Sequence, residues 1–316
     1  MDVAGKRVYV GLSGGVDSAV SAALLQRSGA SVTGVFIKGW YPPGMPCTWA
    51  AERRDAMRVA VRLRIPFRTF DASVEYKKEV IDYLLAEYRA GRTPNPDVMC
   101  NREVKFGAFY RYAMEQGADS IAMGHYLGGE KDQRYFLWAV PRDVWAKTLF
   151  PVGHMEKSAV RVLAKQFDLP VAKKPDSQGI CFLGSVSVKE FLRSEIGDNP
   201  AILHTIGERV PGGYVVGKDV VTGEVEVAPT PRSTQEIRFT NENRLGSWEG
   251  PLTVQYRYHG PRVPGSIPDI RCPTSNVGHR MSYIFESNKP LLETPAPGQS
   301  IVFYRGDELV GGGIID

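Results

Sequence analysis

The sequence has few cysteines and no long hydrophobic run. Four cysteines among 316 residues are too few and too scattered for the disulfide framework of a small secreted domain. No run of about 18 apolar residues occurs, so we expect no helix that spans a membrane. The first buried strand is expected from about Lys6, which leaves no room for a signal peptide ahead of it. These absences predict a cytoplasmic protein with reduced thiols and no membrane partner.

A strong excess of one charge is also absent. The chain carries 39 basic and 35 acidic residues, a net charge of +4, which permits nucleic-acid binding without indicating it. With 43% hydrophobic and 23% charged residues, the composition is that of a globular protein rather than a disordered one. A chain of this length exceeds one ordinary core, so two or three domains are expected.

The clearest motif is the stretch 13–18, which reads Ser-Gly-Gly-Val-Asp-Ser. Apolar and β-branched residues at 7–12 predict a buried strand ahead of it, and residues 19–26 predict a helix behind it. A glycine turn that opens a helix makes an anion site, because backbone N–H groups point outward and the helix dipole favours negative charge. Asp17 alone would repel a phosphate, so its presence suggests that a Mg²⁺ ion lies between the two.

Two common phosphate-binding patterns are missing from this stretch. No Gly-Lys-Ser/Thr follows it, which excludes the loop of P-loop kinases, and the dinucleotide fingerprint Gly-x-Gly-x-x-Gly is absent. The motif instead resembles the pyrophosphate loop of the ATP pyrophosphatase superfamily. Members of that superfamily split ATP into AMP and pyrophosphate and adenylate a carbonyl oxygen. The resemblance therefore implies ATP as a substrate.

Strand-like and helix-like segments alternate over the first half of the chain. This alternation predicts an α/β fold, with a parallel sheet covered by helices on both faces and ligands bound beyond the carboxyl ends of its strands. The predicted strands are 7–12, 31–38, 67–71 and 120–126, and the predicted helices are 19–26, 49–63, 74–88, 103–116, 155–167 and 188–194.

The composition changes after about Asn199. Glycine, proline, valine and threonine dominate there, and short strand-like runs with tight turns predict a small antiparallel β-barrel at the C-terminus. We therefore expect three domains: a catalytic ATP-binding domain at 1–147, a central linker domain at 148–231 and a barrel at 232–316.

Two cysteines, Cys100 and Cys181, are candidates for chemistry. Neither has a partner at metal-ligand spacing, so a zinc site is not expected, and each lies in a polar or glycine-containing loop. Cys100 is placed just ahead of the predicted helix 103–116, whose N-terminus would stabilise a thiolate, the form that attacks or carries sulfur. Cys47 and Cys272 are interpreted as small buried hydrophobic residues.

Longer motifs make the resemblance more specific. Residues 91–97 read Gly-Arg-Thr-Pro-Asn-Pro-Asp and are followed by Cys100-Asn101 and Lys105-Phe106. This segment and several others, which follow one another in the same order along almost the whole chain, resemble the tRNA-specific 2-thiouridylase family. The other matching segments are 124–126, 131–133 with 135–137, 149–153, 173–177 with 179–182, 204–209, 294–299 and 311–315.

This resemblance implies a reaction on RNA. ATP would adenylate the C2 oxygen of the wobble uridine of a tRNA, and sulfur would replace that oxygen, giving 2-thiouridine, AMP and pyrophosphate. Cys181 would carry the sulfur as a persulfide, loaded by a sulfur-relay protein or a cysteine desulfurase. Cys100 would be the nucleophile that releases the sulfur, with a Cys100–Cys181 disulfide as a candidate intermediate, and Asp97 would act as an acid or base.

The resemblance also implies contact residues for each substrate. The Mg²⁺ of ATP would lie near Asp17, and the protein alone would hold no metal. The residues in contact with ATP would be Gly11, Leu12, Ser13, Gly14, Gly15, Val16, Asp17, Ser18, Ile37 and Gly124. The target uridine would be flipped out of the stack, because the C2 atom of a stacked base cannot be reached. The flipped base would contact Asn95, Pro96 and Asp97. Other parts of the tRNA would contact Lys131, Asp132, Gln133, Arg257 and Tyr258.

Two other functions stay open at this point. A different ATP pyrophosphatase, acting on a small molecule, would explain the glycine loop but would leave Cys100 and Cys181 without a role. A catalytically silent tRNA-binding protein would explain the barrel but not the intact loop. Structural roles are also open for single residues: Asp97 could cap a turn, and His125 could be a satisfied histidine at a strand end. Thiolation predicts that both thiols face one cleft beside the glycine loop.

Overall fold

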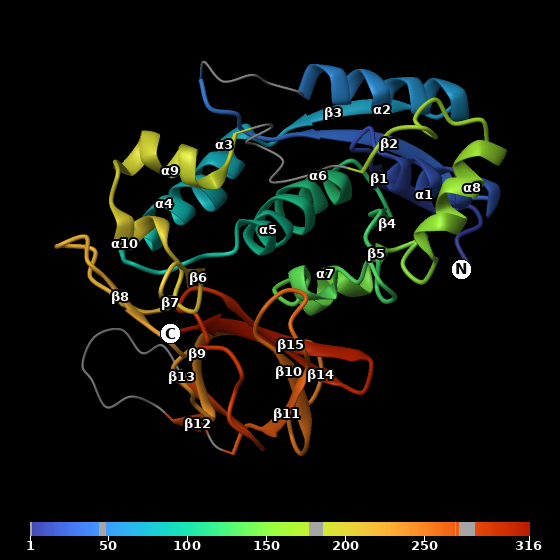
Figure 1. Ribbon diagram of the computed structural model, residues 1–316. Coiled ribbons are helices and arrows are strands. Elements are labelled where there is room, and N and C mark those ends of the chain that lie inside the picture. The colour runs from blue at the N-terminus through green and yellow to red at the C-terminus, as the bar shows by residue number, and fades with distance from the viewer. Residues whose placement is uncertain (1, 44–48, 177–185, 269, 272–281) are drawn as a thin grey trace. The chain divides into compact units, whose positions relative to one another are not determined.

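The computed structural model describes the chain in two compact units (Figure 1). The described residues are 2–43, 49–176, 186–268, 270–271 and 282–316. The first unit comprises Met1–Val80, Cys100–Arg134 and Val140–Ser187, and the second comprises Ile81–Met99, Tyr135–Ala139 and Val188–Asp316. The division into three domains at 147 and 231 stays a prediction.

The first unit is built on a parallel sheet of five strands in the order β3-β2-β1-β4-β5. The central strand β1 pairs on both sides, with Tyr9 in register with Thr33 of β2 and Ile121 of β4. The strands are β1 (Arg7–Gly11), β2 (Ser31–Lys38), β3 (Phe67–Asp71), β4 (Ser120–Ala122) and β5 (Thr148–Leu149). The four predicted strands are confirmed, β4 being shorter than expected, and the two-residue β5 was not predicted.

Helices cover both faces of this sheet. Because side chains alternate along a strand, neighbouring residues of β3 show which helix lies on which face. Thr69 accepts a 2.8 Å hydrogen bond from Arg53 of α2 (Trp49–Leu63), whereas Phe70 stacks on Tyr112 of α6 (Phe109–Glu115) with ring centroids 4.7 Å apart. The predicted α/β architecture is therefore confirmed.

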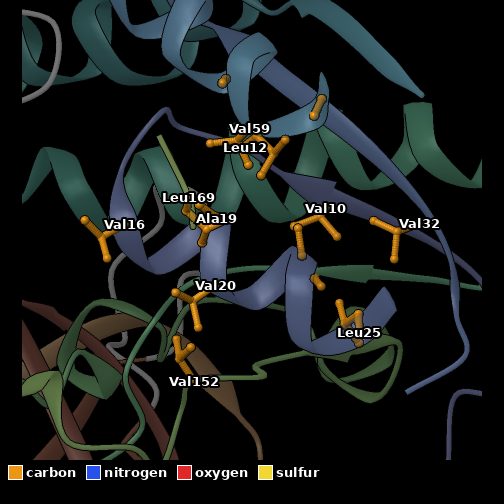
Figure 2. Packing of buried hydrophobic residues seen from close by; sticks show 14 of the residues in the cluster. Val10, Leu12, Val16, Ala19, Val20, Leu25, Val32, Val59, Val152 and Leu169 are labelled. Atoms are coloured by element: carbon orange, nitrogen blue, oxygen red, sulfur yellow. The ribbon is translucent and has the colours of Figure 1, made fainter. Parts of the chain in front are cut away.

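The core of the first unit lies between the sheet and three helices, α1 (Val16–Arg27), α2 and α8 (Lys157–Gln166). Figure 2 shows Val10 of β1, Val20 of α1 and Val59 of α2 packed in this cluster, and all three are fully buried. Apolar burial contributes about 25 cal/mol per Å², so this cluster fixes α1 and the loop before it against the sheet.

Helical residues run without a break from Pro96 to Glu115, through α5 (Pro96–Met99), the π-helical segment η2 (Cys100–Ala108) and α6. The predicted start of this helix, at residue 103, is therefore wrong. Asn95 sets the true start, because its Oδ1 accepts hydrogen bonds from the main-chain nitrogens of Asp97 (3.1 Å) and Val98 (3.4 Å). Pro96 at the first helical position completes a usual helix N-terminus.

Most of the remaining helices are short. The exception is the run 73–89, which confirms the helix predicted at 74–88: three helical segments follow one another there without a break, and the middle one is π-helical. The predicted helices at 155–167 and 188–194 are confirmed as α8 and α9. The elements are α3 (Ser73–Tyr76), η1 (Lys77–Asp82), α4 (Tyr83–Arg89), η3 (Arg134–Phe136), α7 (Arg142–Ala146), α9 (Val188–Ile196) and α10 (Pro200–Leu203).

The second unit contains the predicted antiparallel barrel. Six strands close into a ring in the order β11-β10-β14-β15-β9-β13, because β13 pairs back with β11, and β12 extends β13 at the side. Aromatic residues, including Phe239, Tyr283 and Phe303, fill its core. The strands are β9 (Glu236–Arg244), β10 (Leu252–Gln255), β11 (Val263–Ser266), β12 (Ile270–Arg271), β13 (Ser282–Ser287), β14 (Ser300–Arg305) and β15 (Glu308–Ile315).

A small antiparallel sheet precedes the barrel in the chain. It has three strands in the order β6-β7-β8. Its strands are β6 (Arg209–Val210), β7 (Gly213–Lys218) and β8 (Val225–Ala228).

The glycines of β15 let side chains from other segments pack against its backbone. A Cβ atom at Gly312 would lie 2.8 Å from the ring of Trp138. The Trp138 side chain is fully buried, and its Nε1 donates a 2.9 Å hydrogen bond to Ser300 Oγ of β14. Residues 135–139 are thus part of the same packed unit as the barrel, although they lie far from it in sequence.

No helix among the described residues is both long enough and apolar enough to cross a membrane.

Candidate functional site

The predicted anion-binding loop joins β1 to α1. Gly14 has a φ of +75°, a conformation that favours glycine, and a Cβ there would overlap the main-chain oxygen of Glu52 in α2. Gly15 is extended and caps α1 without a side-chain hydrogen bond. Gly14 is therefore required by the backbone path, and the loop ends at a helix N-terminus, which suits an anionic ligand.

Two serines hold the loop in shape. Ser18 Oγ accepts a 3.2 Å hydrogen bond from the main-chain nitrogen of Ser13 and lies 3.2 Å from Ser13 Oγ. Ser13 Oγ also accepts a 3.3 Å hydrogen bond from the main-chain nitrogen of Gly15. Ser18 is buried whereas Ser13 is exposed. The first serine of the motif is therefore available to a ligand, while the last supports the turn.

The structure brings the predicted ATP residues of three strands together at the carboxyl edge of the sheet. A Cβ at Gly11 would lie 2.8 Å from Met123 Sδ, beyond β4, and 3.7 Å from Ile37 Cδ1 in β2. A Cβ at Gly124 would lie 2.8 Å from the main-chain nitrogen of Ser18. The small residues at 11 and 124 therefore allow the strand ends to approach the start of α1.

Asp17 has partners that the sequence analysis did not identify. Lys157, the first residue of α8, donates 2.7 Å hydrogen bonds to both Asp17 carboxylate oxygens, and Tyr126 Oη donates one of 2.7 Å to Oδ1. Burial and the bond to Asp17 both raise the pKa of Tyr126, which stays a neutral donor. In the sequence, Lys157 is only one residue of the predicted helix 155–167. Nothing there links it to Asp17, because the two are 140 residues apart.

A metal ion would find few protein ligands here. Among the residues that the structure describes, no group of three His, Cys, Asp or Glu side chains could hold one. Both oxygens of Asp17 already accept from Lys157. Asp17 is thus a carboxylate that is already paired with the Lys157 ammonium.

Cys100 is buried, with 9% of its surface exposed, and it is the first residue of the π-helical segment η2. It lies inside the helix rather than just ahead of it, so the expected stabilisation by a helix N-terminus, which falls off within the first turn, is reduced. The two basic residues that follow it in sequence have partners of their own, because Arg102 pairs with Glu103 and Lys105 donates to Asn101 Oδ1 at 3.1 Å. π-Helical turns occur frequently at functional sites.

The residues expected at the target base start the same helical run. Asn95 provides the N-cap, Pro96 is the first helical residue, and the Asp97 side chain is exposed in the first turn. Asn95 is therefore the residue that caps this helix. The Asp97 carboxylate lies at the surface, where a substrate could approach it.

His125 comes directly after the Gly124 turn and packs among aromatic rings. Its ring centroid lies 5.7 Å from that of Phe106 and 6.3 Å from that of Phe150, and its Nδ1 is buried without a hydrogen-bond partner among the described residues. Burial, with a smaller contribution from the positive charge of Lys105, lowers the pKa of His125 well below 6.5. The side chain is therefore neutral at physiological pH.

His125 should make the protein sensitive to acid. Below pH 6.5 the unfolded chain protonates this histidine while the folded chain does not, so its contribution to stability is present above pH 6.5 and is lost as the pH falls. At pH 5.5 the loss should be on the order of 1 kcal/mol. Thermal unfolding of the wild type and of His125→Phe at pH 7.5 and 5.5 measures it. We expect the wild type to lose more stability than the variant between these pH values, and equal losses would contradict the assignment.

The predicted tRNA contact 131–133 is only partly available. Lys131 is exposed. Asp132 forms a two-oxygen ion pair with Arg134, with Nε to oxygen distances of 2.9 and 3.0 Å, and Gln133 accepts a 3.0 Å hydrogen bond from the main-chain nitrogen of Tyr126. Lys131 is thus the side chain of this group best placed to meet a phosphate.

The predicted pair Arg257-Tyr258 lies in the second unit, just after β10. Arg257 donates to the main-chain oxygens of Ile206 (3.1 Å) and Thr294 (3.3 Å), so it also supports the local structure. Tyr258 is 38% exposed, and its ring centroid lies 4.4 Å from that of Phe136. An exposed tyrosine backed by a second aromatic ring is a surface on which a nucleobase can stack.

Three of the four cysteines, Cys47, Cys181 and Cys272, lie outside the described residues. The expected persulfide position, the disulfide with Cys100 and the meeting of the two thiols in one cleft are therefore predictions that the described residues leave untested.

The parallel sheet, its glycine loop and the strand ends around it define an α/β domain of the pyrophosphate-loop class. The profile described as "tRNA methyl transferase HUP domain" matches residues 6–185, and that described as "Aminomethyltransferase beta-barrel domain" matches residues 233–315. The chain belongs to the tRNA-specific 2-thiouridylase family, as its curated relatives show.

These relatives match almost end to end. The chain is 37% identical to the tRNA-specific 2-thiouridylase MnmA of Enterococcus faecalis over 98% of this chain and 95% of that protein, with the same values for the MnmA of Streptococcus mutans. Among solved structures, the U34-tRNA thiolase NcsA from Methanococcus maripaludis superposes with a TM-score of 0.40 at 19% identity, over 64% of this chain and 69% of that one. That likeness is too distant to bear on function.

Proposed function

We propose that this protein is an ATP-dependent sulfurtransferase that converts the wobble uridine of a tRNA into 2-thiouridine. The observation that carries the proposal is the match to 2-thiouridylases along 98% of the chain. The pyrophosphate loop and the cysteine at position 100 lie within that match. A pyrophosphatase acting on a small molecule is less well supported, because it gives no role to the barrel or to the cysteines.

ATP would bind with its phosphates at the start of α1. The Gly14 turn opens the loop, and Ser13 offers an exposed hydroxyl donor. Gly11, Ile37 and Gly124 surround the carboxyl edge of the sheet beside it, which gives a small apolar surface for the rest of the nucleotide. Mg²⁺ would arrive bound to the phosphates, because Lys157 already pairs with both oxygens of Asp17.

The chemistry then needs a sulfur nucleophile. ATP turns the C2 oxygen of uridine into a good leaving group by joining it to AMP with release of pyrophosphate. The terminal sulfur of a Cys181 persulfide attacks C2 and AMP leaves. Cys100 Sγ then attacks Cys181 Sγ, which breaks the sulfur–sulfur bond, releases 2-thiouridine and forms a Cys100–Cys181 disulfide that an external thiol reduces. Asp97, exposed in the helical first turn, would give or take the proton.

The direct test is thiolation by the purified protein. Unmodified tRNA with a wobble uridine, ATP with Mg²⁺, a cysteine desulfurase with cysteine as the persulfide source and an external thiol should give 2-thiouridine, AMP and pyrophosphate, detected by mass spectrometry of the digested tRNA and by nucleotide chromatography. Loss of product without ATP is part of the expectation. Adenylation of a small metabolite with no thiolated tRNA would favour the other pyrophosphatase function. The sulfur donor in the cell and the cytoplasmic location stay predictions.

The exposed tyrosine of the barrel should contribute to tRNA binding. We expect Tyr258→Ala to weaken tRNA binding about tenfold, because stacking of a base on an aromatic ring contributes about 1–3 kcal/mol, and to leave ATP binding unchanged. Leu292→Ala is the matched control, since Leu292 is 80% exposed in the same unit but has no predicted tRNA role. Filter binding with labelled tRNA measures both. Equal tRNA affinities for the two variants would contradict the assignment.

A further inference from the structure

A cluster of charged side chains surrounds the glycine loop, and apart from Asp17 its members have no role in the function described above. All of its members belong to the first unit, and together we call them the loop cluster. They are Asp17, Asp55, Lys157, Arg161, Lys174 and Asp176.

Lys157 joins two carboxylates that come from distant parts of the chain. Its Nζ lies 2.7 Å from both oxygens of Asp17 and 3.0 Å from Asp176 Oδ1, and only 18% of its side chain is exposed. Without this ammonium the two carboxylates would face each other across a short gap and repel. Lys157 is therefore the link between the loop and the segment that holds Asp176.

A second link joins the same segment to the loop backbone. Lys174 Nζ donates hydrogen bonds to the main-chain oxygen of Gly14 (3.0 Å) and to Asp55 Oδ2 (2.8 Å). Arg161 donates to the main-chain oxygen of Lys174 (3.1 Å) and to Asp176 Oδ1 (2.6 Å). Residues 174 and 176 are thus both fastened, and Pro175 between them has a fixed φ that limits the backbone.

The protonation state of Asp176 agrees with this arrangement. Burial alone would raise the pKa of Asp176, but Lys157 and Arg161 outweigh it and hold the pKa below its usual value. The carboxylate is therefore charged at neutral pH, and both ion pairs are present under working conditions. Since these side chains are only partly exposed, the pairs are screened less than pairs on an open surface.

We propose that Lys157 and Asp176 are positioning residues that couple nucleotide binding at the glycine loop to the placement of residues 174–176. The coupling rests on the proposed function only in that the loop binds the phosphates of ATP. The Gly14 carbonyl, held by Lys174, is part of the turn that receives them. By reciprocity, a segment that holds the loop in its binding shape is itself held more firmly when ATP is bound.

The position of this segment matters because Cys181 lies close to it along the chain. Cys181 comes five residues after Asp176 in the sequence, and a chain of that length reaches about 18 Å at most. Fastening Asp176 beside the loop therefore limits the distance between the loop and the cysteine expected to carry sulfur, in any conformation of the chain between them.

The variant Asp176→Asn separates positioning from simple electrostatics. Removing a negative charge near the phosphates should by charge alone tighten ATP binding, whereas loss of the link to Lys157 should weaken it. We expect the dissociation constant of ATP with Mg²⁺, measured by isothermal titration calorimetry on the full chain, to rise about fivefold, within the usual range of coupling between sites. In a Lys157→Met background the link is already absent, so Asp176→Asn should leave only the charge effect and should not weaken ATP binding further.

Two more variants complete the test. Lys157→Arg should keep most of the affinity, because a guanidinium can pair with both carboxylates, and Lys165→Met, an exposed lysine on the same helix, should not change it. Unfolding temperatures of all variants report whether any has lost its fold. Unchanged or tighter ATP binding by a folded Asp176→Asn protein would overturn the proposal, whereas a wild type that binds no ATP would instead overturn the proposed function of the loop.

Discussion

Replacing Cys100 by serine should reduce the formation of 2-thiouridine at least about a thousandfold, as loss of a nucleophile commonly does. Serine has nearly the shape of cysteine, so the buried position at the start of η2 should stay packed. A hydroxyl at neutral pH does not attack a disulfide sulfur, so the step that releases the sulfur would stop. ATP binding should be unaffected, because the glycine loop is unchanged.

The experiment is a time course of thiolation, followed by mass spectrometry of digested tRNA, with ATP affinity measured in parallel. Cys272→Ser is the matched control, since it removes a thiol for which no role is predicted, and it should thiolate at the rate of the wild type. If Cys100→Ser kept its rate, the nucleophile would have to be another group, and the proposed sulfur release through a Cys100–Cys181 disulfide would fail.

Replacing Gly14 by alanine should weaken ATP binding about a hundredfold. Alanine at a φ of +75° costs about 1–2 kcal/mol, and its methyl group would also overlap the main-chain oxygen of Glu52, which cannot move without shifting α2. The loop would have to change shape, with loss of about two charge-assisted hydrogen bonds to phosphate, each worth about 1.5–3 kcal/mol.

Gly5 offers a control with the same backbone conformation. Its φ is +74°, but a Cβ there would have nothing within 4 Å, so Gly5→Ala tests the backbone strain without the overlap. We expect both variants to lower the unfolding temperature and only Gly14→Ala to raise the dissociation constant of ATP in calorimetry. Normal ATP binding by Gly14→Ala would show that the phosphates bind elsewhere.

Much of the fold could be predicted because the residue pattern of most segments favours the same secondary structure that their packing in the folded chain requires. The strand at 31–38 is rich in β-branched and apolar residues, and its predicted bounds are those observed. The start of the Cys100 helix was missed although Asn95-Pro96 carries a usual N-terminal signal, because two prolines near each other also predict a loop. β15 contains three consecutive glycines, a pattern that is unfavourable in strands, and the packing of Trp138 against Gly312 is a tertiary contact that no local pattern reveals.

The site could be predicted only where one continuous motif builds it. The glycine loop is such a motif, and the sheet topology then brought Gly11, Ile37 and Gly124 to the same edge. The loop cluster could not be found this way, since the ion pairs Lys157–Asp17 and Lys174–Asp55 join residues more than a hundred positions apart and a lysine in a helix has no local signal. The expected roles of Asp97, Lys131 and Tyr258 came from family resemblance and stay predictions.

The burial of Trp138 has a consequence for how the chain is made. Its indole donates to Ser300, 162 residues further along, so at a synthesis rate of about 5–20 residues per second the tryptophan waits roughly 8–30 s for its partner strands to leave the ribosome. During that time an apolar surface that β14 and β15 later cover is open to chaperones and to aggregation. The barrel can complete its folding only after β15 has left the ribosome, and removing β15 should harm solubility before it harms chemistry.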